Sequence, residues 1–445
     1  MQLVTKDPNA FTTAITKTAG NLFRTGTLLE AATNLMDGGK IPEIAAQSLS
    51  PCELDRMVRE IVRQSNKRAE RHLAKASQSS QIEERILSIL LAGSFTAKLS
   101  LQPKKGDSES TPEAIRGEIL SRIGSFTARQ APLIFALVLG GTKARVGLKT
   151  GSTTLPDLAE WFAWARLEAL AVAIGSVYGP GAKFFAIPDG PLYSPDFAAI
   201  ADCDAHIRQS AADVKLLGLR HITIPFSTSW IDGEWEQAVQ ELLPAAERGI
   251  AGKPKETAEH LESLYASVDS FRLGLNYEAA VLTYTAIAAK LAEKREVKAE
   301  DKSGLALKQQ LLSLSPALPE SARSAAEEIM AQARLAKPRY DAVNFAIRQT
   351  QLLERIIEHE TGSREYVRLS VHAKPYELQP QFFDASHLVK TPTLLPMHSI
   401  GFSAVRGENY EIGPAFHLDA RMRSWVPMGD ATGRILWYSA PASVR

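Results

Sequence analysis

The sequence has few of the residues and motifs that would assign it quickly to a class. Only two cysteines, Cys52 and Cys203, occur among 445 residues, and neither belongs to a CxxC pair. This excludes a disulfide framework and favours a reducing compartment, so we expect a cytoplasmic protein. The longest apolar run, APLIFALVLGG, is about half of the roughly 20 residues that a membrane span needs. The N-terminus lacks the apolar core of a signal peptide, and we expect no membrane association.

An excess of charge of either sign is also missing. Lysine and arginine together number 51 and aspartate and glutamate 50, while apolar residues make up 45% of the chain. This balance argues against a nucleic-acid partner. The charged and apolar fractions are those of an ordinary globular protein, and the length exceeds one average domain.

The common catalytic and cofactor motifs are absent as well. The GGTK segment at 140–143 does not fit the GxxxxGK[ST] phosphate loop, and no GxGxxG, GxSxG or HExxH occurs. We therefore expect no cofactor. The one HxD pair, His417 and Asp419, is not followed by the second histidine of an iron facial triad, so we expect no metal either.

Three short apolar segments are present between residues 131 and 228. APLIFALVLGG (131–141), AKFFAIPDG (182–190) and HITIPFST (221–228) are typical of buried strands, and helical periodicity lies between them. The alternation predicts an α/β fold with a Rossmann-like parallel sheet. Ligands of such sheets bind beyond the carboxyl ends of the strands. Lys143 and Asp189 lie at two of those ends.

Changes in composition divide the chain into four parts. We predict an N-terminal helical extension over 1–80, the Rossmann-like domain over 81–232, and a helical segment over 233–360. The remainder, 361–445, is predicted to be a β-rich, α+β portion that completes the active site. It begins with YVRLSVHAKP, in which apolar and polar residues alternate as they do in a strand.

Side chains suited to binding anions and moving protons occur at the predicted strand ends. Lys143 follows two glycines, where an ammonium can bind a phosphate or carboxylate, although a solvated turn lysine has the same pattern. Arg368, Ser370 and His372 have the spacing of one strand face and can offer an anion fork, a hydroxyl and a titratable group to one ligand. A solvated sheet face is the alternative. His398 follows a proline-punctuated approach, TPTLLPM.

The order of these segments carries more information than any one of them. In sequence come APLIFALVLGGTK, LPDLAEW, VYGPGAKFFAIPDG, YSPDF, VRLSVH and TPTLLPMHSI. This order resembles the isocyanide (isonitrile) synthase family, of the pyoverdine/dityrosine biosynthesis type. The resemblance spans about 82–445 and leaves 1–80 outside, so we expect residues 1–80 to be dispensable for catalysis. The lysine loop, GGTKARV, and the LPM before His398 differ from the family pattern.

The resemblance implies a transferase or lyase that condenses an amino acid amine with the ketone of ribulose 5-phosphate, without a cofactor. The residues that match the family pattern are His372, His398 and Asp189 for catalysis and Lys143, Arg368, Ser370 and Glu160 for substrate binding. Two alternatives stay open: a divergent member that makes a different nitrogen-containing product, and a non-catalytic ligand-binding protein of a natural-product pathway. The sequence leaves the amino acid and the oligomeric state open, with a homodimer as one option.

Overall fold

The structure is a computed structural model. It describes residues 25–38, 47–76, 78–93, 111–139, 155–193, 200–225, 230–251, 277–294, 299–300, 302–370, 378, 380, 402–406, 409–413 and 426–439. The helices are α2 (Thr25–Met36), α3 (Pro51–Ala74), α4 (Ile82–Ala92), α6 (Pro112–Thr127), α8 (Leu158–Gly175), η2 (Gly190–Tyr193), α9 (Ile200–Leu216), α10 (Gly233–Ala251), α12 (Tyr277–Lys294), α13 (Lys302–Leu314), η5 (Ser315–Ala317), α14 (Glu320–Gln349) and α15 (Leu352–Thr361). The strands are β1 (Gln47–Ser48), β2 (Leu133–Leu139), β3 (Ala182–Pro188), β4 (Ile222–Thr223), β5 (Val367–Leu369), β6 (Phe402–Arg406), β7 (Asn409–Gly413), β8 (Val426–Gly429) and β9 (Ile435–Ser439).

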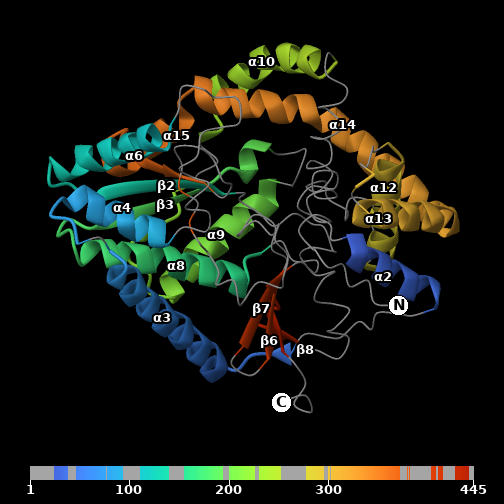
Figure 1. The fold of residues 1–445 in the computed structure, drawn as a ribbon, viewed down its shortest axis with the longest axis horizontal. Coiled ribbons are helices and arrows are strands. Elements are labelled where there is room, and N and C mark those ends of the chain that lie inside the picture. The colour runs from blue at the N-terminus through green and yellow to red at the C-terminus, as the bar shows by residue number, and fades with distance from the viewer. Residues whose placement is uncertain are drawn as a thin grey trace.

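A four-stranded parallel sheet in the order β4-β3-β2-β5 confirms the predicted fold class. β2 pairs with β3 over its whole length, from Leu133 opposite Ala182 to Leu139 opposite Pro188. α6 contacts β2 and β5 while α8 contacts β3 and β4, and Figure 1 shows the two helices on opposite sides of the sheet. Helices cover both faces, which agrees with the apolar run LIFALVL of β2 and with β3, which is apolar except for the exposed Lys183. The third predicted strand, 221–228, is reduced to β4 within its described residues.

β5 belongs to the predicted C-terminal, β-rich portion, and it is the edge strand of the parallel sheet. It pairs in parallel with residues 135–137 of β2. Val367 and Leu369 are buried in the main core, and Arg368 between them is half-buried. The alternation therefore reflects an edge strand of the parallel sheet, which has apolar neighbours on one face only.

Residues 47–74 are integrated into the body of the protein. Ser50 and Glu53 form a capping box that starts α3, which then packs against α8. Ile61 is fully buried in the main core, and the Ser65 hydroxyl donates a hydrogen bond to the carbonyl of Ala165 (2.5 Å). β1 pairs with β8 at the other end of the sequence. A truncation to Gln81 would therefore remove part of the core and a strand, and a loss of turnover in it would reflect folding as well as chemistry.

The helical segment predicted over 233–360 is helical in most of its described residues, with short breaks at 299–300, 318–319 and 350–351. α14 contacts α10, α12 and η2, and thereby connects the helical segment to the α/β domain (Figure 1). α2 joins this segment too, because Leu29 packs with Ala289 and Leu311 in a small separate cluster.

A second sheet, in the order β1-β8-β9-β6-β7, contains the C-terminal strands. A buried arginine attaches it to the α/β domain. Arg434, in the turn before β9, donates two hydrogen bonds to the Asp213 carboxylate of α9 (2.7 and 3.1 Å) and one to the carbonyl of Pro156 (3.1 Å). Burial would lower the pKa of the Arg434 guanidinium, but pairing with Asp213 and Asp430 raises it overall, so the group stays charged.

The burial of α3 predicts the effect of an Ile61→Ala substitution. Removing a fully buried isoleucine leaves a cavity and should lower the free energy of unfolding by about 2–5 kcal/mol. Arg59→Ala on the exposed side of the same helix should change it by about 0.5 kcal/mol or less. Urea unfolding followed by circular dichroism measures both. Equal effects of the two substitutions would show that α3 does not pack on α8.

Candidate active site

The strand order places a topological switch point between β2 and β5, and we expect a ligand crevice at the carboxyl ends of these two strands. From β2 the chain moves outward through β3 to β4, and it then returns to the opposite side of β2 as β5. Connections leave these two strands in opposite directions, which is the arrangement at which open α/β sheets bind ligands. Leu137 of β2 lies opposite Leu369 of β5, so the two segments that follow start from neighbouring strands.

Three predicted site residues lie outside the described part of the chain. In the sequence, Lys143 follows the end of β2 by four residues and His372 follows the end of β5 by three. His398 precedes β6. The His417–Asp419 pair and Asp196 of YSPDF are outside the described residues as well. The roles of these residues stay predictions.

The start of α8 explains the Pro-Asp-x-x-Glu motif. The Asp157 side chain accepts a hydrogen bond from the amide of Ala159 (2.7 Å), and the Glu160 side chain accepts one from the amide of Asp157 (2.8 Å). Both carboxylates are buried. A helix that follows the first strand of such a sheet often binds phosphate at its N-terminus, but here the protein's own carboxylates occupy that position. Glu160 thus has a structural role, and its assignment to substrate binding stays a prediction.

The Tyr-x-Pro-Gly turn also has a structural explanation. The Tyr178 hydroxyl donates to the carbonyl of Ala131 (2.8 Å), just before β2. Gly181 has a φ of +73°, a conformation that favours glycine, and its carbonyl accepts from the amide of Leu133 (3.0 Å). These contacts join the start of β3 to the start of β2 at the amino end of the sheet. They lie at the opposite end of the strands from the crevice.

Asp189 lies where β3 ends, beside two phenols that the sequence did not identify. The rings of Tyr193 and Tyr340 stack with centroids 5.0 Å apart, and the Tyr193 hydroxyl donates to Asn344 Oδ1 (3.0 Å). Burial and then the Asp189 charge raise the pKa of Tyr193, and the pKa of Tyr340 is also raised, chiefly by burial. Both phenols are therefore protonated near neutral pH and can donate hydrogen bonds. Tyr340 comes from the middle of α14, where no local pattern indicates a site.

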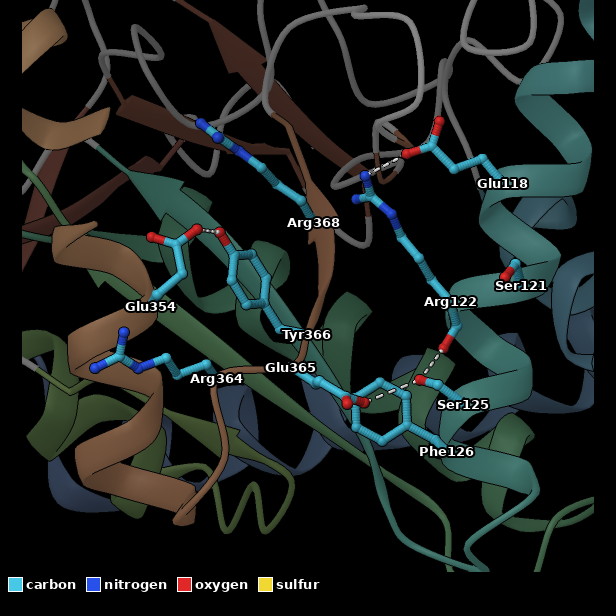
Figure 2. A pocket seen from close by; sticks show the side chains of 10 residues that line it. All are labelled: Glu118, Ser121, Arg122, Ser125, Phe126, Glu354, Arg364, Glu365, Tyr366 and Arg368. Atoms are coloured by element: carbon cyan, nitrogen blue, oxygen red, sulfur yellow. Dashed lines mark hydrogen bonds and ion pairs between the residues drawn. The ribbon is translucent and has the colours of Figure 1, made fainter. Parts of the chain in front are cut away.

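Arg368 lines a groove of about 650 Å³ along β5. Figure 2 shows β5 in the middle of the groove, with α6 on one side and α15 on the other. Arg368 and Tyr366 point to the α15 side, whereas Arg122 lies on the α6 side against Glu118. The groove is lined by Glu118, Ser121, Arg122, Ser125, Phe126, Glu354, Arg364, Glu365, Tyr366 and Arg368. Basic and acidic side chains are thus present in equal number.

Tyr366 and Glu354 form a polar pair beside Arg368. The Tyr366 hydroxyl donates to Glu354 Oε1 (2.9 Å). Burial, followed by the Glu354 charge, raises the pKa of Tyr366, so the phenol stays neutral and the carboxylate accepts. Neither residue belongs to the site predicted from the sequence. Tyr366 lies two positions before Arg368, and this strand-face spacing is the signal that could have found it.

Ser370 is buried at the end of β5. Its amide donates to the carbonyl of Leu378 (3.0 Å), and Leu369 forms a bridge with Leu378 on the same side. The backbone after β5 is therefore held by a returning segment. The substrate-binding role of Ser370 stays a prediction.

Among the described residues, no group of three or more His, Cys, Asp or Glu side chains could hold a metal ion. None of the described helices is long and apolar enough to span a bilayer.

The fold defines an α/β protein whose parallel sheet has a switch point between β2 and β5. Residues 123–215 match the model of a family described as pyoverdine/dityrosine biosynthesis protein. The match runs from the second half of α6 almost to the end of α9, so it includes β2, α8 and β3. It confirms, for this segment, the family resemblance inferred from the sequence.

The chain is also similar to the crystal structure of the PvcA protein from Pseudomonas aeruginosa, with 18% sequence identity and a TM-score of 0.44. The alignment covers 81% of this chain and 100% of the PvcA chain. These values are too low to transfer a fold or a function. No curated protein matches the chain.

The burial of Cys203 on α9 predicts that its thiol reacts slowly. Burial, followed by the charges of Asp202 and Asp204, raises the pKa of the Cys203 thiol to about 12. The thiolate fraction at pH 8 is then on the order of 10⁻⁴, and iodoacetamide should label Cys203 at least about 100-fold more slowly than the exposed Cys52. Peptide mass spectrometry over time measures both rates in one sample. Comparable labelling of the two thiols would show that this region is open.

Proposed function

We propose that this protein is an isonitrile synthase-like enzyme of natural-product biosynthesis. It condenses the amine of an α-amino acid with the ketone of ribulose 5-phosphate, and the ketone carbon becomes the isonitrile carbon. The family match over 123–215 carries the proposal. The proposal places the reaction in the cytoplasm, in agreement with the two free cysteines.

The geometry of the crevice supports chemistry of this kind. The reaction begins when the amine attacks the ketone, forms a carbon–nitrogen double bond and releases water, so the site must bind two anions and move protons. Arg368 lies in β5, and Lys143 follows β2 in the sequence. Their cationic side chains suit the phosphate and the carboxylate of the two substrates. His372, His398 and Asp189 suit proton transfer near pH 7. The α8 N-terminus is already capped, which favours side chains over this helix end as the phosphate ligands.

Mass spectrometry of the product tests the function directly. The protein is incubated with each proteinogenic amino acid and with ribulose 5-phosphate that carries ¹³C at its ketone carbon. We expect one amino acid to yield an isonitrile that contains the label. A labelled product of another kind would identify the divergent family member, and binding without turnover would identify a non-catalytic pathway protein.

Substitution of the two cationic residues predicts a large loss of activity. Removing a charged donor from a desolvated anion should cost roughly 2–5 kcal/mol, which corresponds to a fall in kcat/KM of about 30-fold to a few thousand-fold. Lys143→Ala and Arg368→Ala should show this loss, whereas His372→Ala should lower kcat more than it weakens binding. Arg59→Ala is the control, because this exposed arginine pairs with Asp55 on α3 and neither residue lines the groove. A kcat/KM for Lys143→Ala within about threefold of wild type would remove the lysine from the site.

The chemistry also predicts independence from metal ions. Amine–ketone condensation and sugar fragmentation require acid–base groups, and the sequence offers no iron triad. Enzyme dialysed against EDTA should therefore keep its full kcat in metal-free buffer. Loss of turnover that Fe(II) restores would contradict this mechanism.

A further inference from the structure

Several charged side chains that line the groove form ion pairs within the protein. At the amino end of β5, Arg364 pairs with Glu358 and Glu365 pairs with Arg129. On the α6 side Arg122 pairs with Glu118. These contacts neutralise the charges within the protein.

Glu354 is different. Its recorded partner is the neutral Tyr366 hydroxyl, and within the described part of the chain no basic side chain forms an ion pair with it. Figure 2 shows Glu354 and Arg368 on the same side of β5, with the Tyr366 ring beside them. An acidic and a basic group thus lie on the α15 side of β5, within the same groove.

We propose that Glu354, Tyr366 and Arg368 form a subsite for a zwitterionic α-amino acid, in which Arg368 binds the carboxylate and Glu354 binds the ammonium. The inference rests on the proposed function and assigns the groove to its amino acid substrate. It leaves the phosphate of the second substrate to Lys143.

The chemistry of the three side chains suits this ligand. A guanidinium binds a carboxylate through two parallel hydrogen bonds, which fixes its orientation. The Tyr366 hydroxyl holds one oxygen of Glu354, so the carboxylate is oriented before the ammonium arrives. The groove volume of about 650 Å³ accommodates an amino acid side chain, with Phe126 among the lining residues. Arg368 lies opposite Ala136 in the middle of β2, so the subsite flanks the central strand before its carboxyl end.

Ligands that differ by one charged group can show whether a side chain contacts that group directly or only supports the structure of the groove. The twenty proteinogenic amino acids are titrated calorimetrically into the full chain without sugar phosphate. The tightest ligand is then compared with its decarboxylated amine and with its deaminated acid. In wild type both analogues should bind at least about tenfold more weakly, since each lacks a charge-assisted contact.

The variants should remove these preferences one at a time. Glu354→Gln should weaken the amino acid about tenfold or more while it leaves the deaminated acid within about twofold. Arg368→Ala should instead remove the preference over the decarboxylated amine. Tyr366→Phe should give a smaller effect in the same direction as Glu354→Gln. Glu358→Gln, one turn further along α15, is the matched control and should retain both preferences.

The result that overturns the inference is an equal weakening of all three ligands by Glu354→Gln, or the absence of binding by any amino acid. These outcomes are distinct from failure of the proposed function. A protein that binds amino acids with the predicted preferences but makes no isonitrile retains the subsite and loses the reaction. An active enzyme whose preferences do not depend on Glu354 retains the reaction and loses the subsite.

Discussion

The pairing of β5 with β2 is the contact on which the candidate site depends. β5 has three residues and follows β4 only after the whole helical segment, yet it takes the position beside the central strand. Burial of Val367 and Leu369 in the main core stabilises this position. Without the pairing, Arg368 and the residues after β5 would have no fixed relation to the end of β2.

Two polar arrangements then determine what can bind at the crevice. The Asp157–Glu160 capping box occupies the α8 N-terminus with the protein's own carboxylates, so the proposed anion sites are arginine and lysine side chains. Arg434 attaches the C-terminal sheet to α9 and to Pro156, one residue before the α8 cap. Removing one partner of the buried Arg434–Asp213 pair leaves an uncompensated buried charge. We therefore expect the C-terminal sheet and the α/β domain to unfold in one transition.

Local patterns predicted those parts of the protein whose residues determine their own structure. The run LIFALVL is long enough and apolar enough to identify β2, and the helical periodicity of 158–175 identifies α8. Parts that depend on distant partners escaped prediction. The alternation in VRL indicates a strand but not its neighbour, and the pattern of α3 indicates a helix but not that α8 covers it. Tyr340 and Glu354 join the site regions only through the packing of α14 and α15, which no local signal records.

The central claim is that substrates bind at the carboxyl ends of β2 and β5. Diffraction from crystals of the protein grown with ribulose 5-phosphate tests it most directly. The account predicts phosphate density within hydrogen-bonding distance of the Lys143 ammonium, with the ketone carbon facing the Arg368 end of β5. Phosphate bound at the amino ends of the strands, or against the second sheet, would contradict the account.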